Sequence, residues 1–379
     1  MGGIKNSMKV ALVGGHFSPA LSILEFLQHR GDTVVVLGRK KTFEGQEDIS
    51  LEYRICEEKK VPFYEIRASR LQRKFTRHTI PSLLKFFTGV HDAYQALKKT
   101  KPDIVLSFGG YLSIPIAFSA KVLGIPLVIH EQTQHAGLAN KIAAKIAEKV
   151  LVTFPSSEKY FPKKKTVVTG NPLRKEIFEI KKTQKVTPGK KILYVTGGSS
   201  GSHFINELIE SVLPELVQEF TVIHQIGDGQ AFHDFDTLDM VRNLLPEEVR
   251  SDYIMKQFVY PDEIGWILAY ADLVIARSGV NTVLELIALK KISLLIPLPH
   301  GQAGEQLANA RLIKKLGLGD YKEQDEIERQ LFLDLIHTLI KKSSQSSEKQ
   351  GNSIPLDADI RIVKILDSIY EKKTAKTTE

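Results

Sequence analysis

Short apolar segments alternate with amphipathic segments of helical period along most of the chain. In the first half, apolar runs occupy residues 10–13, 33–37, 104–106, 127–129 and 150–152. In the second half, the same pattern recurs at residues 192–195, 221–223, 273–275 and 293–296. Apolar runs of this length are typical of strands buried on both faces of a parallel sheet, with helices as the crossover connections. The pattern predicts an α/β protein with two Rossmann-like, doubly wound domains.

Two of the predicted strands run directly into a glycine-rich turn and then a helix. The first turn contains Gly14 and Gly15, and the second contains Gly197 and Gly198, followed by Ser199. A turn without Cβ atoms lets backbone N–H groups and a helix N-terminus approach a phosphate closely. A tight strand-to-helix turn that binds nothing would have the same sequence, so each turn is a candidate phosphate site.

The domain boundaries follow from composition. Residues 181–190 are polar, basic and interrupted by a Pro-Gly pair, which is typical of a linker. We therefore expect one domain over residues 8–178, a second over 190–355, and an amphipathic C-terminal helix over 356–372 that packs on the body. Asp357 can cap this helix. Residues 341–352 are expected to form an exposed loop, and residues 371–379 to be disordered.

Length and composition narrow the class of protein. The 379 residues, 42% of them hydrophobic and 25% charged, suit a globular protein of two domains. No apolar run approaches the roughly 20 residues that span a bilayer, and the N-terminus has no signal-peptide core, so we expect the cytoplasmic side. Cys56 is the only cysteine, which excludes an internal disulfide and a multi-cysteine metal site. A net charge of +8 favours anionic partners such as phosphates, nucleic acid or a lipid surface.

A further strand-turn-helix element carries polar side chains. Apolar residues 273–275 lead to Arg277, Ser278 and Gly279, and Glu285 lies about one turn into the predicted helix. Such a carboxylate can accept hydrogen bonds from a ribose diol, or it can complement the helix dipole. The segment at residues 297–310 follows the next strand and carries polar groups suited to sugar hydroxyls, although an ordinary polar loop would look similar.

Several segments of the two halves form one ordered set of motifs. The second half contributes Ser199, the Arg277-Ser278-Gly279…Glu285 element, and Gln306 with Asn309-Ala310. The first half contributes a glycine-tyrosine loop at Gly109-Gly110-Tyr111, the segment His130-Glu131-Gln132 with residues 136–141, and Gly170-Asn171-Pro172-Leu173-Arg174. Taken together and in order, these elements resemble the MurG-type UDP-N-acetylglucosamine transferases of glycosyltransferase family 28. The resemblance runs from about residue 10 to residue 316.

The resemblance implies a GT-B glycosyltransferase whose two domains face a cleft. The implied reaction is an inverting transfer of N-acetylglucosamine from UDP-N-acetylglucosamine to the C4 hydroxyl of the muramoyl sugar of lipid I, which gives lipid II for peptidoglycan synthesis. Neither a cofactor nor a metal is expected, because a helix N-terminus can supply positive potential and no carboxylate pair has metal-binding spacing.

The resemblance also implies a role for particular residues. On the donor side these are Gly198, Ser199, Arg277, Ser278, Glu285, Glu305 and Gln306, with the diphosphate at Ser199, the ribose at Glu285 and the sugar hydroxyls at Glu305 or Gln306. Arg174 is a candidate phosphate contact because a guanidinium suits bidentate binding, although it could also be an exposed linker arginine. On the acceptor side the implied residues are Gly14, Gly15, Tyr111, Glu131 and Thr133.

The displacement needs a base for the acceptor hydroxyl. His16 is the best candidate, because imidazole titrates near neutral pH and the family has a histidine here; it could instead cap a helix or contact phosphate. Two positions depart from the family pattern. The family's first turn is a longer Gly-Gly-Thr-Gly-Gly-His sequence, and Thr133 stands where the family usually has asparagine.

A basic amphipathic segment is a candidate membrane contact. Residues 66–91 contain no acidic side chain and combine basic residues with apolar ones. Such a segment can lie on an anionic membrane surface, at roughly 1 kcal/mol per basic residue. The expected contacts are Arg73, Lys74, Ile80, Leu83, Phe86 and Phe87. A core-facing helix after a solvated basic loop would give the same pattern.

The sequence thus favours a peripheral enzyme on the cytoplasmic face of the cell membrane, acting on UDP-N-acetylglucosamine and lipid I at an anionic inner membrane surface. Nucleic acid is not expected as a partner, because the basic run is confined and lacks aromatic residues arranged for stacking. Two alternatives remain open. One is another lipid-acceptor GT-B glycosyltransferase, such as a diacylglycerol glycosyltransferase. The other is a noncatalytic membrane module that binds a UDP-sugar.

Overall fold

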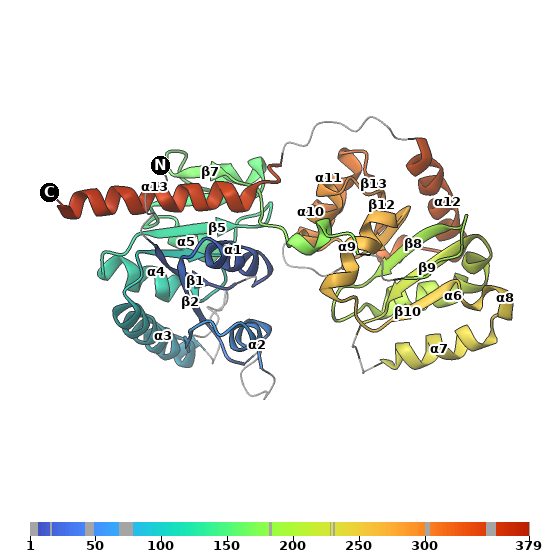
Figure 1. Cartoon of the computed structure of the whole chain (residues 1–379), viewed down its shortest axis with the longest axis horizontal. Coiled ribbons are helices and arrows are strands. Elements are labelled where there is room, and N and C mark those ends of the chain that lie inside the picture. Colours follow the sequence, from blue (N-terminus) through green and yellow to red (C-terminus); the bar gives the residue numbers. More distant parts are fainter. Residues whose placement is uncertain are drawn as a thin grey trace. The chain divides into compact units, whose positions relative to one another are not determined.

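The computed structural model describes residues 7–15, 17–41, 49–67, 79–181, 184–227, 229, 232–299, 304–345 and 354–378, with only the backbone described at 79–86, 344–345 and 376–378 (Figure 1). The chain divides into two compact units, each with its own sheet. The first unit is Met1–Arg174 with Ser353–Glu379, and the second is Lys175–Asn352.

The first unit contains a seven-stranded sheet in the order β3-β2-β1-β4-β5-β6-β7. All neighbouring strands in it run parallel. The strands are β1 (Lys9–Val13), β2 (Thr33–Gly38), β3 (Phe63–Glu65), β4 (Ile104–Ser107), β5 (Leu127–Glu131), β6 (Lys149–Val152) and β7 (Thr166–Val168). The helices are α1 (Phe17–His29), α2 (Leu51–Glu58), α3 (Thr79–Thr100), α4 (Ser113–Val122), α5 (Leu138–Ala143), the 3₁₀ turn η1 (Pro155–Tyr160) and α13 (Ala358–Thr378).

Successive side chains of each strand point to opposite faces of this sheet, and helices cover both. Leu12, Val36 and Leu106 pack on one face with residues of α1 and α13. Val13 and Val105 pack on the other face with residues of α3, α4 and α5. Burial on both faces explains why the strands read as continuous apolar runs in the sequence.

The second unit contains a six-stranded parallel sheet in the order β10-β9-β8-β11-β12-β13. Its strands are β8 (Lys191–Thr196), β9 (Phe220–Gln225), β10 (Tyr253–Lys256), β11 (Leu273–Ala276), β12 (Ser293–Leu295) and β13 (Gly319–Tyr321). Its helices are η2 (Lys175–Phe178), α6 (His203–Glu219), α7 (Asp234–Leu244), α8 (Glu247–Arg250), α9 (Pro261–Tyr270), α10 (Val280–Ala288), α11 (Glu305–Lys315), η5 (Gln324–Glu326) and α12 (Arg329–Gln345). Apolar residues of α6 and α12 pack against strand residues on one face of this sheet (Figure 1).

Both sheets reverse their strand order at one point, which lies between β1 and β4 in the first unit and between β8 and β11 in the second. In open α/β sheets, ligands bind outside the carboxyl ends of the strands at this switch point. Both glycine turns found in the sequence follow a strand that borders it. The prediction of two Rossmann-like, doubly wound domains is confirmed.

The domain limits differ from the sequence expectation. Residues 175–190 group with the second unit, where Asp252 accepts hydrogen bonds from Thr187 Oγ1 at 2.6 Å and Lys190 Nζ at 2.7 Å. The expected linker is therefore attached to the second unit by hydrogen bonds. The C-terminal helix packs on the first unit, where Ile362, Val363 and Leu366 join its core.

Two expectations about the C-terminal region were wrong. Helix α12 extends through Gln345, so part of the expected loop at 341–352 is helical, and residues 346–353 lie outside the described part of the chain. Helix α13 continues to Thr378 rather than becoming disordered at residue 371. Good helix formers in this stretch favour that extension, and Lys373 Nζ anchors it by donating to the Asp103 carbonyl at 3.2 Å.

Candidate functional site

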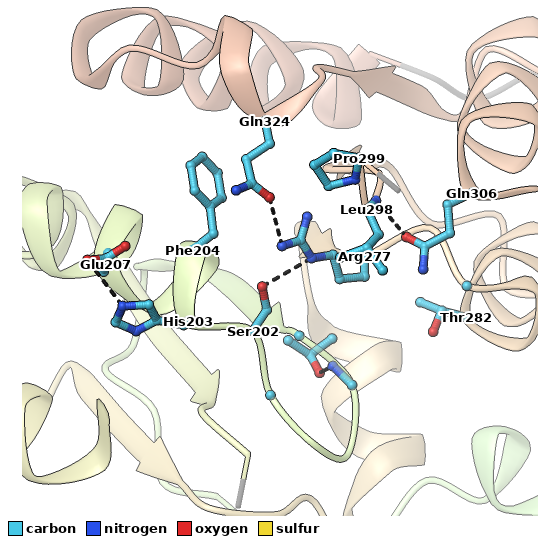
Figure 2. Close-up of a pocket in the computed structure, with 15 residues that line it drawn as sticks. Ser202, His203, Phe204, Glu207, Arg277, Thr282, Leu298, Pro299, Gln306 and Gln324 are labelled. Atoms are coloured by element: carbon cyan, nitrogen blue, oxygen red, sulfur yellow. Dashed lines mark hydrogen bonds and ion pairs between the residues drawn. The ribbon is translucent and has the colours of Figure 1, made fainter. Parts of the chain in front are cut away.

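A cavity of about 610 Å³ opens where β8 and β11 end in the second unit (Figure 2). Its walls are the turn between β8 and α6, the first turn of α6, the start of α10, and the loop after β12. The residues that line it are Thr196, Gly197, Gly198, Gly201, Ser202, His203, Phe204, Glu207, Arg277, Gly279, Thr282, Leu298, Pro299, Gln306 and Gln324. The cavity therefore lies at the topological switch point of its sheet.

Glycine is required in the β8–α6 turn. Gly198 and Gly201 have φ values of 93° and 77°, a conformation that other residues rarely adopt. A Cβ on Gly201 would also collide with the Ile226 carbonyl, whereas the space beside Gly198 is open. The N-terminus of α6 follows at His203, and the first N–H groups of a helix have no partner within it. The turn can therefore hold an anion.

Arg277 lies in the middle of the lining residues in Figure 2. Its Nε donates to Ser202 Oγ at 3.1 Å, and its Nη2 donates to Gln324 Oε1 at 3.1 Å. Its Nη1 lies 3.1 Å from the Ile296 carbonyl oxygen and 3.2 Å from that of Pro297. Burial lowers the pKa of the guanidinium from its usual value. Arg277 thus joins the walls of the cavity to one another while contributing positive charge to it.

Some of the residues predicted on the donor side line this cavity, and others do not. Gly198, Arg277 and Gln306 line it, and Gln306 Oε1 accepts from Leu298 N at 2.9 Å. Glu285 is buried on α10, one turn beyond the lining residue Thr282. Besides Glu285, four predicted residues are not among the lining residues: Ser199, Ser278, Glu305 and Arg174.

These four residues occupy different environments. Ser199 is exposed in the β8–α6 turn, and Glu305 is the first residue of α11. Ser278 is fully buried, and its hydroxyl has no hydrogen-bond partner among the described residues. Arg174 is half-buried at the end of the first of the two segments that make up the first unit.

His203, which was not predicted from the sequence, also lines the cavity. His203 stacks on Phe232 with ring centroids 4.0 Å apart, and its Nδ1 lies 2.6 Å from Asp234 Oδ1. Asp234 Oδ2 accepts from Asn206 Nδ2 at 2.7 Å, and Asn206 Oδ1 in turn lies 3.1 Å from Nε2 of the buried His224. The position of His203, directly after the glycine turn, was the one available signal in the sequence.

Two glycine turns also meet in the first unit. A Cβ on Gly15 would collide with the Gly109 carbonyl, so the turn after β1 touches the turn after β4. Gly109 and Gly110 have φ values of 86° and 78°. The predicted acceptor-side residues Gly14, Gly15 and Tyr111 are therefore brought together at the switch point of this sheet. Tyr111 lies half-buried there, and its hydroxyl accepts a hydrogen bond from Arg39 Nη1.

Glu131 organises the loop that follows β5. Its Oε1 accepts from Thr133 N at 3.0 Å, and its Oε2 accepts from Gly137 N at 2.9 Å and Asn140 Nδ2 at 3.0 Å. The Thr133 hydroxyl lies 2.8 Å from Glu131 Oε1 and 2.6 Å from the His135 carbonyl. Both predicted residues thus hold the shape of the loop, and the short threonine fits between its two acceptors.

Several predicted residues cannot be placed. His16, Arg73 and Lys74 lie outside the described residues, and the side chains of Ile80, Leu83 and Phe86 on α3 are not described. Phe87 on the same helix is 63% exposed. None of the helices in the described ranges is both long and apolar enough to cross a membrane. Within the same ranges, no three His, Cys, Asp or Glu side chains form a group that could hold a metal ion.

Comparison with known proteins accounts for both units. Residues 13–152 match the glycosyltransferase family 28 N-terminal domain, and residues 192–361 match the glycosyltransferase family 28 C-terminal domain. Among solved structures, MurG of Acinetobacter baumannii is similar with a TM-score of 0.67 and 23% identity, covering 95% of this chain and 99% of that one. Together with the two domain matches, this likeness confirms the GT-B fold.

Curated relatives are similar over nearly the whole chain. A protein of Clostridium perfringens is 33% identical over 367 residues, which are 93% of this chain and 97% of the relative. A protein of Lachnospira eligens is 32% identical over 369 residues, 94% and 98% of the two chains. Both are named UDP-N-acetylglucosamine–N-acetylmuramyl-(pentapeptide) pyrophosphoryl-undecaprenol N-acetylglucosamine transferase. With both domain models matched in order, this chain belongs to glycosyltransferase family 28.

Proposed function

We propose that this protein transfers N-acetylglucosamine from UDP-N-acetylglucosamine to the C4 hydroxyl of the muramoyl sugar in lipid I, with inversion at the anomeric carbon. The observation that carries the proposal is similarity over more than nine-tenths of the chain to transferases named for this reaction. The alternatives, a diacylglycerol glycosyltransferase and a noncatalytic module, have no comparable support.

The cavity of the second unit is the proposed donor site. The β8–α6 turn, with Gly198 and Ser199, would hold the diphosphate against the N-terminus of α6, and the departing UDP would be stabilised there. Arg277 adds positive charge and fixes Ser202, which begins that helix. Glu285 is proposed for the ribose, and Glu305 and Gln306 for the hydroxyls of the transferred sugar.

The glycine turns of the first unit are the proposed acceptor side. At the carboxyl ends of β1 and β4, the exposed Gly15 and Gly110 touch each other beside the buried Gly14 and Gly109, and backbone without side chains there suits the diphosphate of the acceptor. His16 follows directly and is proposed as the base that takes the proton of the acceptor hydroxyl. Arg174 is proposed as an additional phosphate contact. Ser278, which is fully buried, is proposed to support the Arg277 turn rather than to touch the donor.

A lipid acceptor requires access to a membrane, and the surface of α3 and α4 is the proposed contact. Phe87 on α3 and Phe118 and Val122 on α4 are exposed, and these helices pack against each other (Figure 1). Exposed apolar side chains on a basic protein suit an anionic membrane surface. Arg73, Lys74, Ile80, Leu83 and Phe86 are proposed to extend this contact on the cytoplasmic face.

The deciding experiment is transfer of labelled N-acetylglucosamine from its UDP donor to a lipid I analogue, compared between wild type and His16→Ala. We expect wild type to make the disaccharide product, and the variant to lose transfer while it still binds UDP. A folded wild type that binds the donor and leaves lipid I unmodified would overturn the proposal. Diacylglycerol, offered as a second acceptor, tests the rival enzyme directly.

A further inference from the structure

Glu52 places a carboxylate against the acceptor-side turn from a distant part of the sequence. It belongs to the first turn of α2, which begins at Leu51 after the cap residue Ser50, whose Oγ accepts from Tyr53 N at 3.2 Å. Its Oε1 accepts from Arg39 N at 2.7 Å, directly after β2. The side chain therefore extends from α2 to the carboxyl ends of the first unit's strands.

Two glycines leave the space that this carboxylate occupies. A Cβ on Gly14 would come within 2.6 Å of Glu52 Oε2, and a Cβ on Gly38 would come within 2.6 Å of Oε1. The carboxylate thus lies between the ends of β1 and β2, in contact with the turn that continues to Gly15. Because Gly15 in turn touches Gly109, Glu52 lies beside the surface proposed for the acceptor diphosphate.

The surroundings of Glu52 do little to offset a negative charge. Burial raises the pKa of its carboxyl to about 7, against the opposing effects of the Arg39 backbone hydrogen bond and charge. The Arg39 guanidinium itself is directed to Tyr111, whose hydroxyl accepts from Nη1, and to the Lys41 carbonyl at 2.9 Å. The carboxylate therefore gains one backbone hydrogen bond and no ion pair among the described residues.

Few other titratable groups act on it. On its own helix, burial and the neighbouring Glu52 raise the pKa of the Cys56 thiol to about 12, so that thiol stays neutral near pH 7. The other side chains that approach the two glycines are Phe17 and Phe63, which carry no charge. Among the described residues, Arg39 is the one charged group that acts on the Glu52 carboxyl.

We propose that Glu52 is an additional residue of the acceptor site, and that its protonated, uncharged form is the one that admits the acceptor's diphosphate to the Gly14–Gly15 turn. The inference rests on the proposed function and adds a residue to it. An ionised carboxylate behind the turn repels the diphosphate in a site where the dielectric is low. The protonated acid removes that repulsion. Since a diphosphate diester is ionised throughout the neutral range, the acceptor itself contributes no titration there.

The test is the pH dependence of the acceptor KM in the transfer reaction, with Glu52→Gln as the mimic of the protonated acid. For wild type we expect the acceptor KM to rise about tenfold from pH 6 to pH 8, following the ionised fraction of one group that titrates near 7. In Glu52→Gln the acceptor KM should stay at the wild-type pH 6 value, and the donor KM should be flat in both proteins. Glu58→Gln, an exposed position on the same helix, is the matched control and should keep the wild-type slope.

The experiment distinguishes a failure of the role of Glu52 from a failure of the proposed function. Ionisation of His16, the proposed base, would appear in kcat and would persist in Glu52→Gln. A wild-type acceptor KM that is independent of pH, or a Glu52→Gln variant with the wild-type slope, would overturn the role of Glu52 while leaving the proposed function intact. If neither wild type nor the two variants transfer sugar, the proposed function fails. Direct binding of the lipid I analogue then decides about Glu52, because the same tenfold weakening is expected in Kd and a flat Kd contradicts it.

Discussion

A single guanidinium group joins three segments of the second unit. Arg277 donates to Ser202 before α6, to two carbonyl groups after β12, and to Gln324 in η5. The sequence pointed to Arg277 as a donor contact, but its hydrogen bonds show a positioning role that depends on residues up to 75 positions away. A lysine cannot reproduce this planar arrangement of donors.

We therefore expect Arg277→Ala to weaken UDP binding about tenfold or more and to lower the free energy of unfolding of the second unit by about 1–3 kcal/mol, because carbonyl groups lose their donors. Arg277→Lys should restore little of either quantity. Calorimetric titration with UDP and urea unfolding measure the two effects. Arg311→Ala, at an exposed position of α11, is the control and should match wild type. Unchanged UDP affinity in Arg277→Ala would contradict the positioning role.

His224 gives the second unit a defined response to acid. Burial lowers the pKa of its imidazole from 6.5 to about 3. Between these pH values the unfolded chain binds a proton that the folded state does not. The free energy of unfolding should therefore fall as the pH drops below 6.5, by up to about 1.4 kcal/mol per pH unit.

The fluorescence of Trp266 can follow this effect, because it is the only tryptophan and is buried in the second unit. In urea titrations at pH 7.5, 6 and 5, the free energy of unfolding of His224→Gln should fall much less below pH 6.5 than that of wild type. His337→Gln, at a more exposed histidine of α12, should retain it. Equal slopes in wild type and His224→Gln would exclude His224 as the source.

At the scale of secondary-structure elements, α13 is a late segment of the sequence that completes an early domain. Its apolar side chains join a core built mainly from α1 and the strands β1, β2 and β4. Arg30 strengthens this contact, because its Nη1 donates to Asp367 at 2.8 Å and its Nε donates to Asp32 at 2.6 Å. The amphipathic pattern predicted the helix, whereas the partner face depends on the return of the chain to the first unit.

Removing one core side chain of α13 should destabilise the first unit alone. For Leu366→Ala we expect a loss of about 2–5 kcal/mol in the free energy of unfolding, because the residue is fully buried. Ile360→Ala, 42% exposed on the same helix, should change it by less than about 0.5 kcal/mol. Far-UV circular dichroism should show an earlier transition for Leu366→Ala while the Trp266 transition stays in place. Simultaneous movement of both transitions would show that the units unfold together.

At the scale of the whole molecule, each unit has its own parallel sheet and its own core, and the residues that line the cavity proposed for the donor all belong to the second unit. A ligand that binds one folded unit stabilises that unit by mass action. With free UDP at about a hundred times its Kd, we expect the unfolding free energy of the second unit to rise by about 2.7 kcal/mol.

Hydrogen exchange with and without UDP locates this stabilisation. Core amides of β8 and β11 should exchange more slowly with UDP, whereas those of β1 and β4 should not change. Arg277→Ala at the same UDP concentration serves as the control and should show a smaller effect. Equal protection of both units would contradict a donor site formed by the second unit alone.

The sequence by itself determined the fold class, the family and nine of the thirteen strands in the described residues, all except the outermost strands β3, β7, β10 and β13. Strands buried on both faces must be apolar throughout, and turns close to phosphates must lack Cβ atoms, so both features are visible in local sequence. The sequence did not indicate where α13 ends, that residues 175–190 belong to the second unit, or that Glu52 lies beside Gly14. These depend on contacts between residues far apart in the chain, such as Lys373 with Asp103 or Glu52 with Gly14. Only the tertiary structure decides them, because a side chain's burial, charge and partners are set by the elements that pack around it.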